Sequence, residues 1–308
     1  MPRAKGGGES GAISQYAAAD EPIEGPQRSK LAPGLYLVAT PIGNMEDITL
    51  RALKVLAGVD AVLCEDTRVS GKLLARFHIA AKKIPYHDHN TDRVRPGIVA
   101  RLQAGATLAL ISDAGTPLVS DPGFKLVRDA IAAGISVTAV PGASAVLAGL
   151  LLAGLPPDKF LFAGFLPPKP GARRRSLDAL KAVPATLVFF ESGPRLADSL
   201  FDMAAMLGDR DAAVARELTK LYEEVKRGGL AQLAAHYQKT GGPKGEIVVV
   251  VAPPAGEVAA DAATLDDALI AALARVSLRQ AVAEIAASTG LPRREVYARA
   301  LALTGAGR

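Results

Sequence analysis

The chain has 308 residues, of which 49% are hydrophobic and 22% charged, so it can form two globular domains, and its composition excludes global disorder. Its formal net charge is +5, and its single cysteine, Cys64, excludes an internal disulfide and favours a reducing, cytoplasmic compartment. Residues 131–155 carry no charge, but Gly134, Pro141 and Gly149 break this stretch into pieces too short to span a bilayer, so we expect no membrane segment.

The N-terminal part of the chain predicts a tail followed by an α/β domain. Residues 1–32 include three consecutive glycines and lack the apolar core of a secretion signal, so we expect a flexible tail. From residue 33 to residue 153, short aliphatic runs alternate with longer amphipathic ones, which is typical of parallel strands joined by helices. The expected strands lie near residues 35–39, 60–65, 82–89, 107–112 and 136–140.

A second α/β domain is expected from residue 154 to residue 254, after the sequence GLPP. Its strands should lie near residues 160–165, 186–191, 212–217 and 246–252, with helices between them. From residue 255 to residue 308 the strand pattern stops. Residues 265–274, 278–287 and 293–303 predict helices, and the last two have the spacing of a helix-turn-helix.

Three loops that follow predicted strands carry an unusual density of Gly, Pro and polar residues. They are ATPIGN at 39–44, SDAGTPLVSDPG at 112–123 and PGASA at 141–145. Each alone could be a tight turn between a strand and a helix. Together they favour a binding site, because ligands bind at the carboxyl ends of strands in an open α/β sheet. The chain has neither a GxGxxG opening the first helix nor a Walker lysine, so a dinucleotide or phosphate site is disfavoured.

These loops belong to a longer series of motifs that includes EDTR at 65–68, HDHN at 87–90, FFESGPR at 189–195 and RELTKLYEE at 216–224. The series resembles the ribosomal RNA small subunit methyltransferase I family, in the tetrapyrrole-methylase-like group of S-adenosylmethionine methyltransferases. The resemblance covers residues 33–254, and the C-terminal helices match that family's extension. One departure is Gly193, where the family motif has His.

The resemblance implies a fold, a reaction and a partner. It implies two α/β domains that form a cleft for S-adenosyl-L-methionine, with a small C-terminal helical module, in a homodimer. The implied reaction is the 2′-O-methylation of a cytidine ribose in 16S rRNA, at the decoding centre of the small ribosomal subunit.

The resemblance also implies the residues that line the cofactor. A carboxylate and loop carbonyls complement the sulfonium cation and the amino group of S-adenosylmethionine. By motif, the cofactor-binding residues would be Pro41, Ile42, Gly43, Asp113, Gly115, Thr116, Val119, Ser144 and Ala145, with Phe190, Ala215 and Gly245 as weaker candidates.

A ribose hydroxyl is a poor acid, so a general base would assist its attack on the methyl group. The candidates are Glu65, Asp66, His87, His89, Glu191, Glu217 and Lys220, and the sequence does not choose among them. Structural roles are equally open: residues 65–68 could cap a helix with an internal ion pair, and residues 216–220 could be a salt-bridged helix start. His87 and His89 resemble half of a metal site, but no third ligand is evident among four His and one Cys, so we expect no metal.

Basic residues concentrate in two segments, 165–185 and 273–308, each with a net charge of +4. Arginine and lysine in such segments are typical of phosphate contacts, although they could also be a solvated surface. The RNA-binding candidates are Lys169, Arg173, Arg174 and Arg175, in an expected loop, and Arg293 and Arg294, in the second helix of the helix-turn-helix.

Two other functions remain open. A methyltransferase of the same fold that acts on a tetrapyrrole or another small molecule would have no use for the basic segments. A non-enzymatic nucleic-acid binder that uses the helix-turn-helix would leave the motifs of the α/β domains unexplained.

Overall fold

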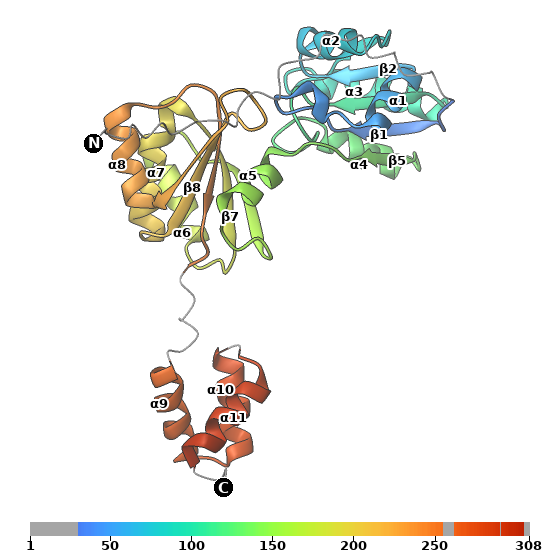
Figure 1. The fold of residues 1–308 in the computed structure, drawn as a ribbon. Helices are drawn as coiled ribbons and strands as arrows, with labels where there is room; N and C mark the ends of the chain where they lie inside the picture. Colours follow the sequence, from blue (N-terminus) through green and yellow to red (C-terminus); the bar gives the residue numbers. More distant parts are fainter. Residues whose placement is uncertain (1–29, 255–261, 290, 305–308) are drawn as a thin grey trace, which may run out of the picture. The chain divides into compact units, whose positions relative to one another are not determined.

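The computed structural model describes residues 30–254, 262–289 and 291–304 (Figure 1). The chain divides into two compact units: the first reaches Pro41 and resumes at Met45–Ala143, and the second comprises Ile42–Asn44 and the chain from Ser144 onward. This division precedes the helix that we assigned to the end of the first domain. The expected tail, up to residue 29, and residues 255–261 lie outside the described residues.

The first unit is built on a parallel sheet of five strands in the order β3-β2-β4-β1-β5. Five short aliphatic runs form it, as the sequence predicted. The strands are β1 (Gly34–Val38), β2 (Ala61–Cys64), β3 (Lys83–Pro85), β4 (Thr107–Ile111) and β5 (Val137–Val140).

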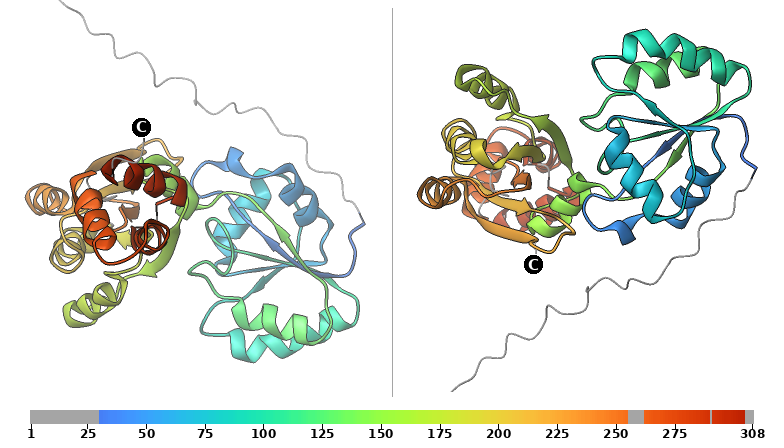
Figure 2. Two further views of the ribbon diagram at one scale, coloured as in Figure 1. Left: turned by 90° about the horizontal axis from the view of Figure 1, so that it is seen from below. Right: turned by 90° about the horizontal axis from the view of Figure 1, so that it is seen from above.

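Helices cover both faces of this sheet (Figure 2). Alternate side chains of a strand point to opposite faces, so each strand contributes to two cores. Val38 and Val62 pack with the helices of one face, and Leu35 and Leu63 with those of the other. The first face carries α1 (Leu50–Gly58) and α2 (Thr67–Arg76), and the second α3 (Thr91–Gln103) and α4 (Phe124–Ala132), with the short 3-10 helix η1 (Met45–Asp47) before α1.

The second unit has a mixed sheet in the order β6-β7-β10-β8-β9. Its strands are β6 (Phe160–Phe165), β7 (Thr186–Ser192), β8 (Asp211–Arg216), β9 (Glu224–Gly229) and β10 (Glu246–Val251). Only β6 and β7 pair in parallel; the other pairs are antiparallel.

The helix start that residues 216–220 could have formed is absent, which corrects that reading. Glu217 and Thr219 have φ values of 51° and 65°, in the left-handed region that an α-helix of L-residues does not use. The segment turns the chain from β8 into β9, a strand that we did not predict from the sequence. β9 lies at the edge of the sheet and carries Glu224, Lys226 and Arg227, so it lacks the apolar alternation that marks a half-buried strand.

Helices α6 (Pro170–Leu180), α7 (Gly193–Leu207) and α8 (Leu230–Thr240) pack with one face of the second sheet in a single core. Helix α5 (Ala145–Ala153) packs against its strands, chiefly β10 and β8. Gly149 of α5 permits this approach, because a Cβ there would lie 2.7 Å from Val248 Cγ1. This packing explains why the two units divide before α5.

The C-terminal helices are α9 (Ala262–Leu273), α10 (Leu278–Thr289) and α11 (Arg293–Thr304). They share a small core that includes Leu269, Val282 and Val296. Arg299 of α11 binds Asp266 of α9 at 2.6 Å. The predicted class, α/β with C-terminal helices, is therefore confirmed. None of the described helices is both long and apolar enough to cross a bilayer.

Candidate active site

The carboxyl ends of β1, β4 and β5, which are neighbours in the first sheet, join the three predicted loops. The Thr40 N–H donates to the Gly115 carbonyl at 2.9 Å, and the Gly115 N–H donates to the Thr40 carbonyl at 3.1 Å. The Thr40 hydroxyl donates to the Ser112 carbonyl at 3.0 Å, and the Thr116 hydroxyl to the Ala143 carbonyl at 3.3 Å. The loops therefore form one hydrogen-bonded surface at the sheet edge where ligands bind in this class of fold.

The second of these loops has an unusual backbone. Gly115 and Gly123 have positive φ values of 83° and 141°, which suit glycine. Leu118 and Ser120 also have positive φ values, of 73° and 65°, which L side chains rarely adopt. Such conformations cost free energy and cluster at ligand-binding sites, so the loop is shaped for more than a connection.

Carboxylates gather at the same sheet edge. Burial raises the pKa of Asp113, whose side chain also accepts a hydrogen bond from the Asp66 N–H at 3.3 Å. Burial raises the pKa of Glu65 as well, and repulsion from Asp121, Asp113 and Asp88 raises it further. The negative potential that this repulsion reflects favours a cationic ligand, such as one with a sulfonium and an ammonium group.

Asp66 has the capping role that the sequence left open. Its side chain accepts a hydrogen bond from the Arg68 N–H at 2.8 Å and caps α2. The Arg68 side chain binds the same carboxylate at 2.7 Å, and these hydrogen bonds lower the pKa of Asp66 to about 2. A carboxylate with so low a pKa is a weak base.

Ile42–Asn44, the second half of the first predicted loop, belong to the second unit. The Asn44 N–H donates to the Thr219 hydroxyl at 3.1 Å. Gly43 packs against Lys220, because a Cβ at this position would lie 2.3 Å from Lys220 Cγ. The RELTK motif therefore contacts the second half of the ATPIGN loop within the second unit, a relation that the separate motifs do not reveal.

Lys220 is held by two carboxylates. Its ammonium group binds Glu217 and Glu246, each at 2.8 Å. Burial alone lowers the pKa of Lys220, but the bonds to the two carboxylates raise it overall, and the bond to Lys220 lowers the pKa of Glu217. Neither residue is thus ready to accept a proton near neutral pH. Gly245, with a φ of 105°, approaches Glu217 so closely that a Cβ would lie 2.4 Å from its Oε1.

Glu191 anchors the start of α7. It is 3% exposed, accepts a hydrogen bond from the Ser199 hydroxyl at 2.5 Å and pairs with Arg195 at 3.5 Å. Next in this motif, Gly193 has no space for the histidine of the family pattern, because a Cβ would lie 1.8 Å from the Pro243 carbonyl oxygen. A larger residue would require the backbone at Pro243 to move.

The weaker cofactor candidates Phe190 and Ala215 lie in one row of the second sheet. Both pair with Val248 of β10, which lies between them, so all three side chains share a face. This is the face that Gly149 of α5 contacts, through Val248. The N-cap of that helix is Ser144, another cofactor candidate.

The two histidines of HDHN lie close together, with ring centroids 6.1 Å apart. Across the described residues, no group of three His, Cys, Asp or Glu side chains is arranged to hold a metal ion. The His87 N–H donates to the Asn90 side chain at 3.0 Å, so the motif forms the turn that leads into α3.

The basic segment at 169–175 begins a helix instead of forming the expected loop. Arg173 is a correction to the RNA-binding set, because its side chain is only 5% exposed and binds Asp202 at 2.6 Å. Arg174 also binds Asp202, at 2.7 Å, but is 52% exposed. Lys169 and Arg175 are exposed, so three of these four cations are accessible.

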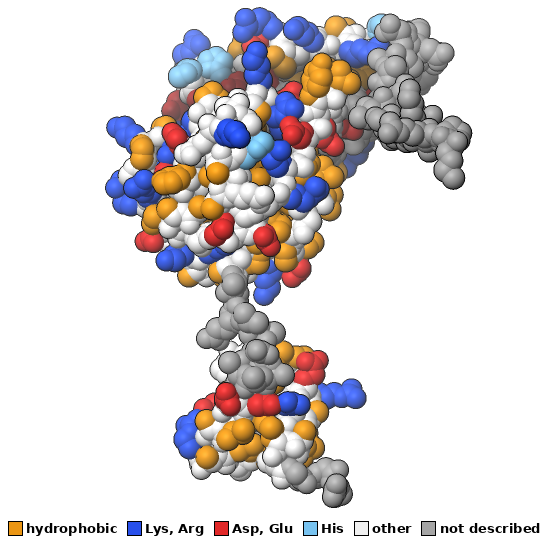
Figure 3. Space-filling model, turned by 60° about the vertical axis from the view of Figure 1, so that its left-hand side comes forward, with side chains coloured by type: hydrophobic (Ala, Val, Ile, Leu, Met, Phe, Trp, Pro, Cys, Tyr) orange, Lys and Arg blue, Asp and Glu red, His pale blue; other side chains and the backbone are white. Residues whose placement is uncertain are grey.

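Arg293 and Arg294 are exposed in the first turn of α11, the second helix of the expected helix-turn-helix. Gly290, which we placed in its turn, lies outside the described residues. On the face drawn in Figure 3, Lys and Arg side chains are distributed over the surface and are not gathered in one patch.

Comparison with known proteins gives the same outline. Residues 34–234 match the family model described as Tetrapyrrole (Corrin/Porphyrin) Methylases, and residues 259–304 match the model described as RsmI C-terminal HTH domain. The chain is 54% identical to the ribosomal RNA small subunit methyltransferase I of Mesorhizobium japonicum, over 89% of this chain and 93% of that protein. It is also 54% identical to the protein of the same name from Erythrobacter litoralis, over 89% of this chain and 96% of that protein.

Solved structures share the fold. A diphthine synthase aligns with a TM-score of 0.55 at 17% identity, over 71% of this chain and 89% of its own. The uroporphyrin-III C-methyl transferase from Thermus thermophilus, solved in complex with S-adenyl homocysteine, aligns with a TM-score of 0.52 at 21% identity, over 70% of this chain and 96% of its own.

Proposed function

The chain belongs to the ribosomal RNA small subunit methyltransferase I family of tetrapyrrole-type S-adenosylmethionine methyltransferases, and from this premise we propose that it methylates the 2′-hydroxyl of a cytidine in 16S rRNA. The observation that carries the proposal is the 54% identity to a relative of that name over 89% of the chain, with the C-terminal helices matching their own family model. We further propose that the enzyme acts in the cytoplasm as a homodimer.

The cofactor would bind at the carboxyl edge of the first sheet. Its chemistry is an electrophilic methyl group on a sulfonium centre. We assign Asp113 to the cationic groups of the cofactor, because it is half-buried among other carboxylates. Gly115, Thr116 and Val119 would approach it through the loop that hydrogen bonds to Thr40. We retain as proposed contacts Pro41, Ile42, Gly43, Ser144, Ala145, Phe190, Ala215 and Gly245.

Among the candidate bases, we assign Glu65. Asp66, Glu217 and Lys220 each have an ion-pair partner that stabilises the charged form of the side chain. Glu191 is held by Ser199 and Arg195 at the start of α7. Glu65 instead has a raised pKa, which brings it closer to the pH at which a general base works best. His89 is exposed and is the alternative. A Glu65→Gln variant should lose the rise in rate with pH while retaining cofactor affinity; an unchanged pH profile would refute this assignment.

The accessible cations of α6 and α11 would bind the RNA backbone. Arginine forms directional pairs with phosphate, and a helix N-terminus favours an anion. Arg174 and Arg175 lie near the N-terminus of α6, after Lys169, and Arg293 and Arg294 begin α11.

The direct test is methyl transfer from labelled S-adenosylmethionine to small ribosomal subunits that lack the modification, followed by identification of the product nucleoside. We expect a ribose-methylated cytidine at one site. Asp113→Ala should abolish cofactor binding, whereas Arg174→Ala should weaken RNA binding in a salt-dependent way and spare cofactor affinity. Cofactor binding without any labelled RNA would instead favour a small-molecule substrate.

A further inference from the structure

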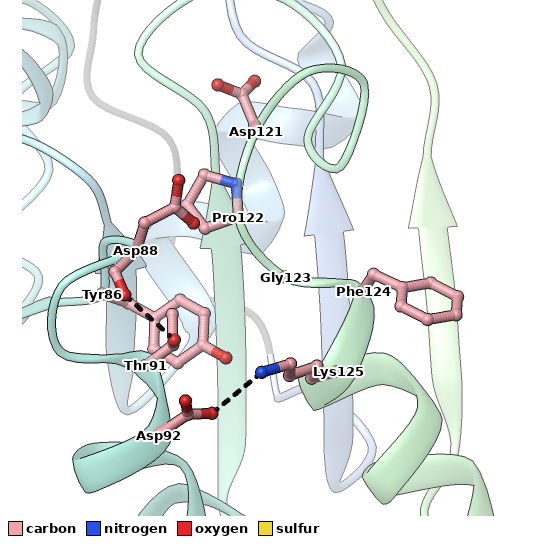
Figure 4. Close-up of a pocket in the computed structure, with 9 residues that line it drawn as sticks. All are labelled: Tyr86, Asp88, Thr91, Asp92, Asp121, Pro122, Gly123, Phe124 and Lys125. Atoms are coloured by element: carbon pink, nitrogen blue, oxygen red, sulfur yellow. Dashed lines mark hydrogen bonds and ion pairs between the residues drawn. The ribbon is translucent and has the colours of Figure 1, made fainter.

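The first unit contains a pocket that none of the proposed cofactor or catalytic residues lines. It lies between the residues that lead into α3, 86–92, and those that lead into α4, 121–125 (Figure 4). The pocket is open to solvent and has a volume of ≈ 320 Å³. It borders the SDAGTPLVSDPG loop, because Asp121 and Gly123 belong to both.

The first observation that indicates a ligand is the hydroxyl of Tyr86. This side chain is 1% exposed, and no atom in the described part of the chain has good hydrogen-bond geometry to its hydroxyl. The Arg95 guanidinium lies near the hydroxyl and opposes the rise in its pKa. A buried hydroxyl without a partner costs free energy, and such groups are few in folded proteins. Burial raises the pKa of Tyr86, so the hydroxyl keeps its proton and can donate it to an acceptor that enters the pocket.

The second observation is that the two ends of the pocket differ: among the described residues, the carboxylates at one end have no cation beside them, whereas the carboxylate at the other end, Asp92, is paired with Lys125 and Arg95. Figure 4 shows the carboxylates of Asp88 and Asp121 toward one end, and the Tyr86 hydroxyl and Lys125 toward the other. Asp121 already accepts a hydrogen bond from Ser112 at 2.5 Å, but a carboxylate has capacity for several more. Lys125 binds Asp92 at 3.2 Å and has further N–H groups to donate.

This arrangement disfavours a bare cation and favours a flat ligand with both donors and acceptors. The Lys125 ammonium group would repel a metal ion. The base-pairing edge of cytosine has an amino donor at one end and ring nitrogen and carbonyl acceptors at the other, which matches the two ends of the pocket. Uracil has a carbonyl where cytosine has the amino group, so its oxygen would face the carboxylates.

We infer that this pocket binds an unpaired cytosine of the substrate RNA, with its amino group at Asp88 and Asp121 and its acceptors at the Tyr86 hydroxyl and Lys125. The inference rests on the proposed function, which supplies a cytidine-containing RNA. Enzymes that do chemistry on a base take it out of its stack and read its base-pairing edge in such a pocket, and an enzyme that methylates the ribose could select its nucleotide in the same way.

The test measures binding of short single-stranded RNA without cofactor, so that it does not depend on methyl transfer. The probe is a labelled oligouridylate with one central cytidine, compared with the same oligomer of uridine alone. We expect the wild-type chain to bind the cytidine probe about tenfold more tightly, as is typical of one well-formed base contact. Tyr86→Phe and Asp88→Ala should each remove most of this preference.

Tyr36→Phe is the matched control, because the Tyr36 hydroxyl is also in the first unit but donates to the Ala32 carbonyl at 2.8 Å. Tyr36→Phe should lower the stability of the fold and keep the cytidine preference. Tyr86→Phe should keep or raise the stability of the fold and lose the cytidine preference, since it removes a hydroxyl that makes no hydrogen bond in the free protein. This opposite pattern separates a ligand-binding role from a structural one.

The outcomes for the two proposals are distinct. Equal affinity of the wild-type chain for both probes, or full preference in Tyr86→Phe, would overturn the inference even if small subunits are methylated. A cytidine preference that Tyr86→Phe removes would support the pocket, even if no methyl transfer to 16S rRNA were found and the proposed function failed.

Discussion

The Asp202→Ala variant tests whether Arg173, in the basic segment 165–185, stabilises the fold and does not contact RNA. Asp202 is 2% exposed and binds both Arg173 at 2.6 Å and Arg174 at 2.7 Å. Its removal leaves the Arg173 guanidinium, itself 5% exposed, with only a long bond of 3.5 Å to the Pro168 carbonyl. A buried charge without its partner destabilises the folded state.

The expected loss in the free energy of unfolding follows from the burial of the two ion pairs that Asp202 makes. Breaking a buried ion pair on one side costs about 3–5 kcal/mol. The Arg174 pair is half exposed and adds at most about 1 kcal/mol, because solvent screens it. For a folding unit of this size, the loss of Asp202 should lower the Tm by roughly 6–24 °C.

Circular dichroism during thermal and urea unfolding would measure this loss. Asp198→Ala is the control, because Asp198 is exposed on the same helix and its replacement should change stability by about 0.5 kcal/mol or less. A loss below about 1 kcal/mol for Asp202→Ala would refute a buried ion pair.

A compensated variant then isolates RNA binding. Arg173→Met combined with Asp202→Leu should recover much of the stability, because apolar residues of similar volume can replace a buried ion pair. That protein should bind RNA as the wild type does. If it lost affinity as strongly as Arg174→Ala, Arg173 would be an RNA contact after all.

Three further predictions concern the two units and the C-terminal module. Asp113→Asn should raise the free energy of unfolding at pH 7 and abolish cofactor binding. The pKa of Asp113 is raised in the folded state, so its ionised form destabilises the fold as the pH rises through that pKa. Urea unfolding would measure the stability, and calorimetry would measure cofactor binding. Gly43→Ala should displace Lys220 and reduce methyl transfer. Gly97→Ala should stabilise the fold by about 0.5–1 kcal/mol, because Gly97 lies within a helix and has open space around it. Activity and unfolding assays on both variants would test these outcomes, and full activity of Gly43→Ala or a destabilised Gly97→Ala would contradict them. Arg294→Ala should weaken binding of small subunits and reduce the salt slope by about 1, and an unchanged slope would exclude a phosphate contact.

The sequence predicted the first sheet well, because its three central strands, β2, β4 and β1, are buried on both faces and read as continuous apolar runs. Leu63 faces α3 and α4 while Val62 faces α1 and α2, so neither position tolerates a polar residue. β9 has no such constraint. As an edge strand it pairs on one side with β8, and charged residues such as Lys226 protect its other side, which removes the pattern that sequence reasoning needs.

The candidate site was predictable in its position but not in its chemistry. The loops follow strands, so their common edge could be inferred, and glycine and proline marked them. The sequence could not choose among the candidate bases, because the ability of each side chain to accept a proton depends on the partner that it binds in the folded chain. Lys220 binds Glu246, which is 26 residues away in the chain, and this partner makes the lysine a positioning residue.

Arg173 could have been recognised as a buried residue from its helical spacing, although its charge alone made it an RNA-binding candidate. Charge density indicates how many cations a segment has, but helical periodicity determines which of their side chains are exposed to solvent. Arg173 lies four residues before Leu177, and both are buried on one side of α6, while the neighbouring Arg174 and Arg175 are exposed. The spacing to Leu177 could therefore have assigned Arg173 to the apolar face. The RNA-binding potential of this helix accordingly rests on Arg174, Arg175 and the preceding Lys169, which lie near its N-terminus, where a phosphate is also favoured by the helix dipole.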